Sequence, residues 1–284
     1  MSLQRSRKAL LRQVCDGFSR NTDSLRECGL RLNGLLVDRS NHILYCAIPK
    51  VASSAVKLAF AFMTGLVNRT SSDAHYPVHL PSWLRSVGVY SVDYLVENDP
   101  IWLKTAWSSL RKFIIVRHPF ERLVSAYVDK FTLRNKFSEF FQRRFGRQIV
   151  RLYRNRSELH HNIASHDDAG HDVKFSEFVR FLIDKRIRCS QKLNPHWMTF
   201  VDVCHPCFVD YDYIVHFEGL PGEMLHLWKT IYNRTNLEEV LHRRNVGQTR
   251  TSNLVADYMN RLPTQDIEAL YELLSIDFKM FSYT

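Results

Sequence analysis

Short apolar runs alternate with longer amphipathic segments along most of this chain. Residues 42–48 form an apolar run that stops at Pro49, a pattern typical of a buried strand. Residues 112–116 repeat this pattern, and the aromatic and β-branched residues 208–217 predict a third strand. We expect these three strands to lie together in one hydrophobic core.

Helical periodicity follows the first two strands. Residues 53–63 and 121–131 are amphipathic, and Pro119 stands where a helix accepts proline in its first turn. Further helices are expected at residues 175–187, 225–232 and 263–274. Buried strands that alternate with helices predict an α/β fold, with a mainly parallel central sheet flanked by helices.

Three stretches depart from this alternation. Residues 1–38 are polar and basic with weak helical periodicity, so we expect a mobile stem or extension there and one domain at residues 39–284. Residues 68–82 contain serine, aspartate, histidine and two prolines and predict a loop. Residues 134–172 are basic and histidine-rich and predict an irregular surface insertion, in which a solvated loop is favoured over a metal site.

Charge narrows the range of partners. The 284 residues carry a formal net charge of +10, which favours anionic partners such as nucleic acid, acidic polysaccharide, anionic lipid or a phosphate-rich cofactor, without choosing among them. Every apolar run falls far short of the roughly 20 residues that span a bilayer. The first eleven residues lack the apolar core of a signal peptide. If the protein resides in a secretory lumen, we expect its targeting segment to be missing from this sequence.

Six cysteines in a chain of this size do not require disulfides. Three glycosylation sequons, at Asn68, Asn155 and Asn233, together favour a secretory compartment. Cys204 and Cys207 have the spacing of a redox pair or half of a zinc site. No second cysteine pair stands at ligand spacing, so structural disulfides are favoured, with Cys189 and Cys28 as candidate partners and the connectivity left open.

The first segment that could carry chemistry lies between a predicted strand and a predicted helix. A helix N-terminus offers unpaired N–H groups and the positive end of a dipole, and small residues let an anion approach the backbone. Lys50 adds a mobile charge, and Ser53 and Ser54 add hydroxyl donors. The alternative is an ordinary capped turn with Lys50 in solvent. The segment comprises Pro49, Lys50, Val51, Ala52, Ser53, Ser54 and Ala55.

The second segment begins where the second strand ends. Ligands of open α/β sheets bind at the carboxyl ends of strands, and an arginine there can form forked hydrogen bonds to phosphate. Ser125, on the following helix, can reach the same anion. Alternatively, Arg117 caps the sheet or pairs with Glu121, and Ser125 is a packing residue. The segment comprises Arg117, His118, Pro119, Phe120, Glu121, Arg122, Leu123, Val124 and Ser125.

Two anion sites in one sheet fit a ligand with two separated phosphates. A P-loop NTPase would place its lysine after glycine and directly before Ser or Thr, and would need an acidic residue for Mg²⁺. Here Lys50 precedes the serines by three and four positions, and the second strand ends in Arg117. These differences disfavour metal-dependent phosphoryl transfer and favour a nucleotide with 5′- and 3′-phosphates.

Both segments resemble the donor-binding motifs of sulfotransferases that use 3′-phosphoadenosine 5′-phosphosulfate (PAPS). The second is closest to the Golgi carbohydrate sulfotransferases that include the chondroitin 4-O-sulfotransferases, and residues 196–218 and 277–283 are similar to the later blocks of that family. Relatives usually carry Cys-Thr or Gly-Thr where this chain has Ser53 and Ser54, and the hydroxyl is kept. The resemblance covers about residues 42–284. It implies a P-loop-like sulfotransferase fold, PAPS as donor, a Golgi lumen location and no metal or nucleic-acid partner.

The resemblance also implies roles. Lys50, Ser53, Ser54 and the loop N–H groups would hold the 5′-phosphosulfate, Lys50 would neutralise the bridging oxygen, and Arg117 with Ser125 would hold the 3′-phosphate. For the base that deprotonates the acceptor we expect His79, against a plain surface histidine, with His75 and His196 as competitors.

The expected acceptor is a glycan, first the N-acetylgalactosamine 4-hydroxyl of chondroitin or dermatan chains, with terminal glucuronic acid and N-glycan N-acetylgalactosamine left open. The many arginines of residues 134–156 would suit a groove for a polyanionic chain. The competing hypothesis is a non-catalytic basic protein that binds acidic polysaccharide. Nothing in the sequence predicts the oligomeric state.

Overall fold

The computed structural model describes residues 2–18, 32, 34–65, 77–154, 170–188, 194–232 and 252–284. Contacts divide the chain into two compact units. Unit 1 comprises Met1–Arg117, Met198–Gln248 and Asp277–Thr284, and unit 2 comprises His118–Trp197 and Thr249–Ile276. Each unit is described by itself below.

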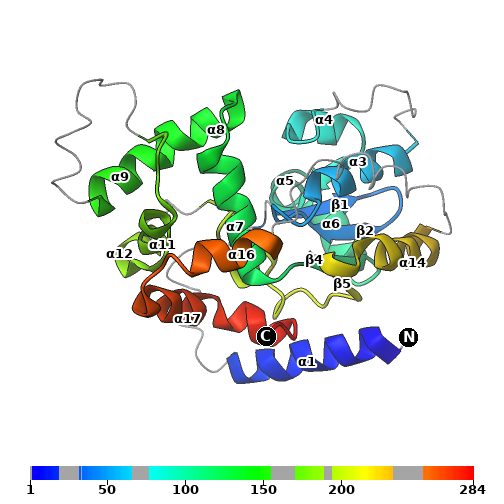
Figure 1. The fold of residues 1–284 in the computed structure, drawn as a ribbon. Helices are drawn as coiled ribbons and strands as arrows, with labels where there is room; N and C mark the ends of the chain where they lie inside the picture. The colour runs from blue at the N-terminus through cyan, green and yellow to red at the C-terminus, as the bar shows by residue number, and fades with distance from the viewer. Residues whose placement is uncertain are drawn as a thin grey trace. The chain divides into compact units, whose positions relative to one another are not determined.

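A five-stranded sheet forms the centre of unit 1, in the order β3-β1-β2-β4-β5 (Figure 1). β2 is parallel to β4 and β4 to β5, whereas β1 runs antiparallel to both β2 and β3. The expected parallel arrangement is therefore confirmed for the strands that precede the two candidate segments. The strands are β1 (Leu35–Asp38), β2 (Ile43–Cys46), β3 (Val89–Ser91), β4 (Arg111–Val116) and β5 (Tyr213–His216).

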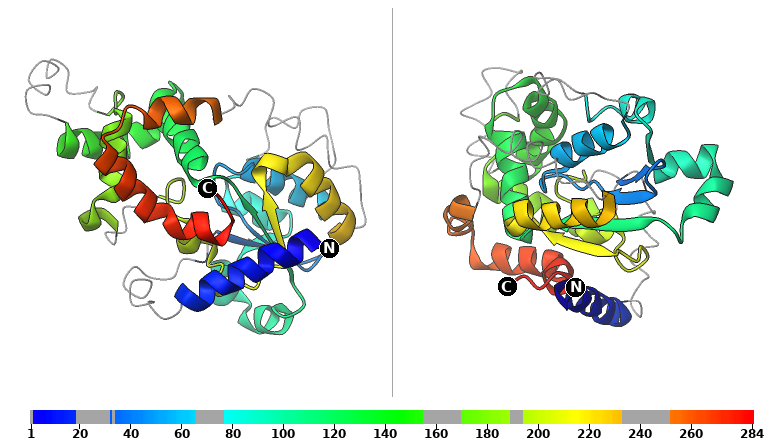
Figure 2. Two further views of the ribbon diagram at one scale, coloured as in Figure 1. Left: turned by 60° about the horizontal axis from the view of Figure 1, so that its bottom comes forward. Right: turned by 90° about the vertical axis from the view of Figure 1, so that its right-hand side faces the viewer.

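Aromatic side chains build the core on one face of the sheet. Tyr45 of β2 stacks on Phe113 of β4 with ring centroids 4.8 Å apart, and Phe60 of α3 (Ser53–Met63) contacts both rings. Trp228 of α14 (Leu220–Tyr232) lies edge-on to Phe60 and Phe113. These contacts hold α3 and α14 against the same face, as Figures 1 and 2 show. The helix that follows the first candidate segment is thus anchored by its apolar side.

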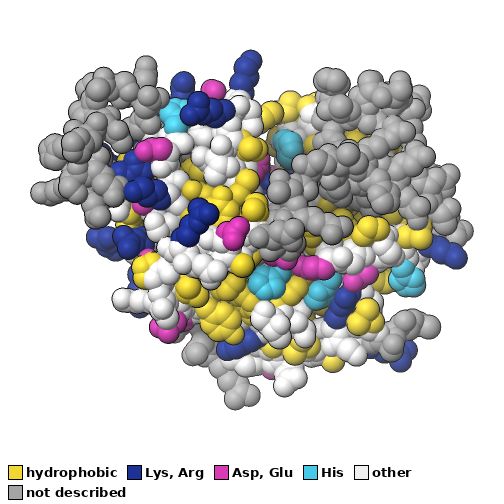
Figure 3. All heavy atoms as spheres, viewed as in Figure 1, with side chains coloured by type: hydrophobic (Ala, Val, Ile, Leu, Met, Phe, Trp, Pro, Cys, Tyr) yellow, Lys and Arg dark blue, Asp and Glu magenta, His cyan; other side chains and the backbone are white. Residues whose placement is uncertain are grey.

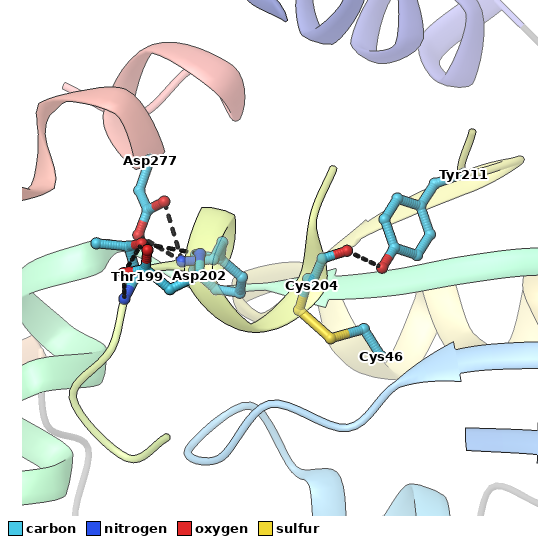
Figure 4. Close-up of a disulfide and its surroundings, with 7 residues drawn as sticks. Cys46, Thr199, Asp202, Cys204, Tyr211 and Asp277 are labelled. Carbon is cyan, nitrogen blue, oxygen red and sulfur yellow. Dashed lines mark hydrogen bonds between the residues drawn. A yellow bond between two sulfur atoms is a disulfide. The ribbon is translucent and has the colours of Figure 1, made fainter. Parts of the chain in front are cut away.

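The opposite face of β2 is held covalently. Successive strand residues point to opposite faces, so Cys46 faces away from Tyr45 and forms a disulfide with Cys204 of α13 (Phe200–Cys204). The Tyr211 hydroxyl donates to the Cys204 carbonyl at 2.7 Å (Figure 4). At the other end of α13, the backbone N–H of Phe200 donates to both carboxylate oxygens of buried Asp277, each at 3.0 Å.

The N-terminal segment is helical. α1 (Ser2–Phe18) contacts the edge strand β5, where the Gln4 side chain accepts from the Ile214 N–H at 2.9 Å and donates to its carbonyl at 3.0 Å. Arg7 donates to the same carbonyl and pairs with Glu223. A disulfide joins Cys15 to Cys207. α1 therefore covers an edge whose backbone groups would otherwise be open to pairing. The predicted division into residues 1–38 and 39–284 stays a prediction.

Helices joined by turns make up the described residues of unit 2, which include no strand, and the core of the unit is aromatic. Phe131, Phe178 and Trp197 contact one another, and the Tyr127 hydroxyl donates to the Val173 carbonyl at 2.6 Å. The last helix begins in this unit and ends in unit 1. The elements are α7 (Pro119–Tyr127), the π-helical turn η3 (Val128–Thr132), α8 (Lys136–Phe141), the π-helical turn η4 (Gln142–Gly146), α9 (Arg147–Tyr153), α11 (Phe175–Ile183), α12 (Lys185–Arg188), α16 (Ser252–Met259) and α17 (Thr264–Met280).

Several expectations need correction. The irregular insertion predicted for residues 134–172 is wrong for residues 136–153, which are helical, while residues 155–169 lie outside the described part. The strand predicted for residues 208–217 is confined to β5, because residues 205–209 form turns after α13. The helix predicted for residues 175–187 breaks at Asp184, whose carboxylate accepts from the N–H of Arg186.

Residues 81–106 contain elements that the sequence pattern did not predict. They hold β3 and three short helices, α4 (Pro81–Ser86), α5 (Val92–Asn98) and α6 (Pro100–Ala106). Within the described part of the chain, no helix is both long and apolar enough to cross a membrane.

Candidate functional site

The loop between β2 and α3 has an unusual backbone. Lys50 and Ala52 have φ angles of 73° and 62°, in the left-handed region that residues other than glycine rarely adopt. α3 begins directly afterwards, at Ser53, and no side chain caps its N-terminus. Backbone turns of this kind aim successive N–H groups into a concavity that binds anions. The predicted turn is thus present at the start of an eleven-residue helix, and its binding of an anion stays a prediction.

The side chains of this first segment divide into two sets. Val51 and Ala55 are fully buried and hold the loop against the core. Ser53 is 8% exposed, and Lys50 and Ser54 are half-buried, so these polar groups remain near the surface of unit 1. The loop can therefore offer a lysine, two hydroxyls and backbone N–H groups to a ligand.

Arg117 of the second segment joins the first segment directly. It follows β4, which is parallel to β2, so the two strands end at the same edge of the sheet. Its guanidinium donates to the Lys50 carbonyl at 3.1 Å and lies 4.5 Å from the ring centroid of Phe217. Arg117 is only 4% exposed, so its position is held from both sides. The structure brings the predicted lysine and the predicted arginine into one site.

His79, the predicted base, is in the same place. Its Nε2 lies 3.1 Å from the Ser54 hydroxyl oxygen, and the ring is exposed. The histidine therefore stands at the N-terminal turn of α3, although 25 residues separate it from Ser54 in the chain. Of its competitors, His75 lies outside the described residues, and His196 belongs to unit 2, where its Nδ1 lies 2.6 Å from the Asn194 side-chain oxygen.

The rest of the second segment lies in unit 2. Pro119 opens α7 as expected, and the apolar side chains of Leu123 and Val124 are buried in the core. Arg122 is 2% exposed and donates to the His196 carbonyl at 3.4 Å, which makes it part of the interior of unit 2.

The other residues of that segment lie nearer the surface. His118, Phe120, Glu121 and Ser125 are half-buried, and the rings of His118 and Phe120 lie 5.9 Å apart. Because Arg117 and Ser125 belong to different units, their joint hold on one phosphate stays a prediction.

Sequence reasoning missed a lysine near the loop. Lys57 lies one helical turn after Ser53, and burial lowers its pKa from 10.5 to about 8. A lysine inside an apolar helical run was the available signal.

The last residue of β5, His216, and the residue that follows it, Phe217, were also not singled out for their roles. Phe217 supports Arg117, and burial, aided by the charge of Arg7, lowers the pKa of His216. Phe217 was noted only as part of a later block, because its packing against Arg117 depends on the parallel register of β4 and β5.

The expectation that Cys204 and Cys207 form structural disulfides is confirmed, but the candidate partners were wrong. Cys204 and Cys207 do sit in disulfides, but with Cys46 and Cys15 in place of Cys189 and Cys28. Since each is bonded to a distant partner, the adjacent redox pair is excluded. Cys28, Cys189 and the three sequons lie outside the described residues. Among the residues that the structure does describe, no three His, Cys, Asp or Glu side chains gather in a way that could hold a metal ion.

Comparison with known proteins gives consistent matches. The profile of the sulfotransferase family matches residues 33–284. Rat carbohydrate sulfotransferase 11 is 31% identical over 260 residues, which cover 89% of this chain and 68% of the rat protein. Mouse carbohydrate sulfotransferase 12 is 28% identical over 298 residues, with 99% and 68% coverage. Human carbohydrate sulfotransferase 8 is 26% identical over 286 residues, with 99% and 62% coverage. No solved structure matches the chain.

Proposed function

Because this chain belongs to the sulfotransferase family and resembles carbohydrate sulfotransferases, we propose that it transfers the sulfuryl group of PAPS to the 4-hydroxyl of N-acetylgalactosamine in a chondroitin- or dermatan-type chain. Sulfotransferase activity and a carbohydrate acceptor follow from the family and the relatives; the sugar and its hydroxyl are the proposal. The resemblance of residues 117–125 to the chondroitin 4-O-sulfotransferase group supports this choice.

The observation that carries the proposal is the hydrogen bond from Arg117 to the Lys50 carbonyl. It links the two loops that the sequence assigns to the two ends of one nucleotide. The guanidinium of arginine presents its N–H donors as a rigid planar fork, which is the geometry that recognises phosphate. In this proposal Lys50, Ser53 and Ser54 bind the 5′-phosphosulfate and Arg117, with Ser125, binds the 3′-phosphate.

His79 completes the proposed chemistry. The acceptor hydroxyl oxygen forms a bond to sulfur as the bond from sulfur to the bridging oxygen breaks, and adenosine 3′,5′-bisphosphate leaves with that electron pair. The hydroxyl proton passes to His79, since histidine can accept a proton near neutral pH. Lys50 neutralises the charge that develops on the bridging oxygen. Most of the acceleration comes from holding donor and acceptor in line.

The compartment is proposed on two grounds. The disulfides Cys15–Cys207 and Cys46–Cys204 are typical of proteins in an oxidising environment. The family resemblance adds the Golgi lumen, where glycan acceptors are extended. Both observations support a luminal enzyme.

Retention on immobilised adenosine 3′,5′-bisphosphate tests donor binding, and transfer of label from PAPS to a panel of glycans tests the activity and the acceptor. We expect the protein to be retained and to label chondroitin. Arg117→Lys keeps the charge but loses the fork and the stacking on Phe217, so we expect at least a tenfold loss of affinity. Arg111→Lys, at the exposed first residue of the same strand, is the matched control and should bind normally.

Different failures point to different errors. A folded wild-type protein that is neither retained nor active would contradict the enzyme assignment and favour a non-catalytic polysaccharide-binding protein. Normal transfer to another sugar, with chondroitin inert, would contradict only the acceptor. Near-normal turnover of His79→Ala would remove His79 as the base and leave the donor site intact.

A further inference from the structure

A second cluster of basic residues lies in unit 2, away in sequence from the donor segments. Arg144, Arg147 and Arg151 follow one another at intervals of three and four residues, which places them on one face of the helical segment η4–α9. With Arg186 of α12 they line a groove of about 620 Å³. The remaining lining residues are Gln148, Leu152, Asp184 and Ile187. Figure 3 shows Lys and Arg side chains gathered over this part of the surface.

Asp184, the one acidic residue among the described lining residues, does not neutralise the groove. Asp184 accepts from the Tyr153 hydroxyl at 2.7 Å and from the Arg186 side chain at 2.6 Å. These two donors, the arginine first, hold the pKa of the Asp184 carboxyl below its usual range, so it stays charged and engaged. Within the described ranges, no carboxylate forms an ion pair with any of the three arginines of η4–α9. Three exposed guanidinium groups therefore line the groove without an ion-pair partner among the residues that the structure describes.

The backbone under these arginines is rigidly placed. Gly170 approaches η4 so closely that a Cβ on Gly146 would lie 2.3 Å from the Gly170 carbonyl oxygen. On the inner side of the same helix, Phe145, Ile149 and Val150 are buried. Just after α9, Arg154 pairs with Glu177 of α11 at 2.8 Å. The arginine row is thus a fixed feature of a packed helix.

We propose that Arg144, Arg147, Arg151 and Arg186 form a binding groove for the sulfate or carboxylate groups of an anionic glycan chain. The guanidinium fork matches both groups bidentately, and a row of forks matches a chain with repeated charges. In this proposal the groove contacts several charged groups of the glycan chain at once. Its further role, holding the acceptor while one hydroxyl is sulfated at the donor site, rests on the proposed function.

Two observations favour a glycan over nucleic acid. Among the described residues that line the groove, none is aromatic, so this part of the lining lacks the stacking platform on which single-stranded bases are usually bound. The two disulfides of unit 1 indicate an oxidising compartment, where the abundant polyanions are sulfated and carboxylated glycans.

The test measures the affinity of the full chain for a fluorescent chondroitin sulfate oligosaccharide at fixed, moderate salt. The variant is Arg147→Gln with Arg151→Gln, which removes two exposed charges from the groove without touching the buried side. The control is Arg5→Gln with Arg111→Gln, which removes two exposed arginines from unit 1. We expect about a tenfold loss in the groove variant, the scale of two charge-assisted contacts in solvent, and little change in the control.

Three outcomes would overturn the proposal: wild-type affinity in the groove variant, an equal loss in the control, or equal affinity of the wild type for single-stranded RNA or phosphatidylserine vesicles of matched charge. In turnover, we expect KM for the anionic chain to rise, with kcat and the KM for PAPS unchanged. A wild type that binds the oligosaccharide through the groove but transfers no sulfuryl group would contradict the proposed function and support the groove.

Discussion

The disulfide between Cys46 and Cys204 ties the strand that precedes the donor loop to α13 on the face of the sheet opposite α3. Both cysteines are fully buried, and Cys46 stands three residues before Pro49. The perturbation is the double substitution of Cys46 and Cys204 by alanine, which removes the bond without leaving a lone buried thiol. We expect a large loss of stability and a secondary loss of donor binding.

The magnitude follows from the length of chain that the bond closes. The two cysteines are 158 residues apart, and closing a loop of that length lowers the entropy of the unfolded chain by an amount worth about 5 kcal/mol. While the Cys15–Cys207 bond is intact, however, Cys46 and Cys204 are also connected through it, from Cys46 back to Cys15 and from Cys207 back to Cys204. This path contains only about 34 residues, the difference between the separations of 192 and 158. A ring of that size corresponds to about 4 kcal/mol. This is a large part of the roughly 5–15 kcal/mol that stabilises a typical domain.

Urea unfolding at pH 7, followed by fluorescence and circular dichroism, measures the effect. We expect the free energy of unfolding to fall by about 4 kcal/mol, with a larger m-value because the unfolded chain becomes less compact. Retention on adenosine 3′,5′-bisphosphate, measured under conditions where the variant is folded, should weaken because the end of β2 loses its anchor.

The matched control is the double substitution of Cys15 and Cys207 by alanine, a half-buried pair that joins α1 to the turn after α13 and involves no strand of the sheet. We expect it to lower stability by a similar amount and leave retention on the bisphosphate unchanged. A loss below about 1 kcal/mol for Cys46/Cys204 would refute the entropic reasoning. Equal loss of ligand retention in both double variants would refute the link between this bond and the loop.

Three other substitutions test single features. Between about pH 8 and 10.5 the unfolded chain binds more protons than the native state, so the wild type gains stability as the pH rises; Lys57→Met should remove this gain and stabilise the protein at pH 7 by up to about 3 kcal/mol. Urea unfolding at pH 7 and 9.5 measures both effects. As a control, exposed Lys104→Met should leave the pH dependence of stability as in the wild type. Asp277→Ala should lower the free energy of unfolding, measured by thermal unfolding, by about 3 kcal/mol, because it removes the acceptor of the Phe200 N–H. Asp277→Asn keeps an acceptor oxygen and should lower it clearly less. Equal losses in the two variants would disprove this explanation. Ala52→Gly should raise the free energy of unfolding by about 0.5–1 kcal/mol, because glycine tolerates the positive φ of this position. At an ordinary helical position, the change from alanine to glycine lowers stability by about the same amount. If Ala52→Gly lowers stability, the loop is not strained at this residue.

Elements with a strong local signal were predictable. The apolar run that ends at Pro49 and the helix at residues 53–63 were placed from sequence to within a few residues, since burial pattern and proline stops are local properties. The pairing of Lys50 with Arg117 was also within reach, because parallel strands that precede helices end at one edge of a sheet.

Elements defined by contacts were not predictable. β1 and β3 are three or four residues long and gain their identity from pairing with β2 and with each other. The helices of residues 136–153 lie in a basic segment whose inner side is anchored by distant residues, including Gly170 and Glu177. A helix that is polar except for a few buried positions shows weak apolar periodicity, so its sequence resembles an irregular segment until the elements that it packs against are known.

The sequence alone predicted the chemistry of the proposed donor site, because lysine, serine and arginine at the ends of strands are recognisable by residue type and spacing. Only the tertiary structure decided which distant residues lie beside those segments. It brought His79 to within 3.1 Å of Ser54 and placed Phe217 against Arg117. It also paired Cys46 with Cys204 and Cys15 with Cys207. These are distances between segments far apart in the chain, and such distances are set by how strands and helices pack, which no local pattern of residues encodes.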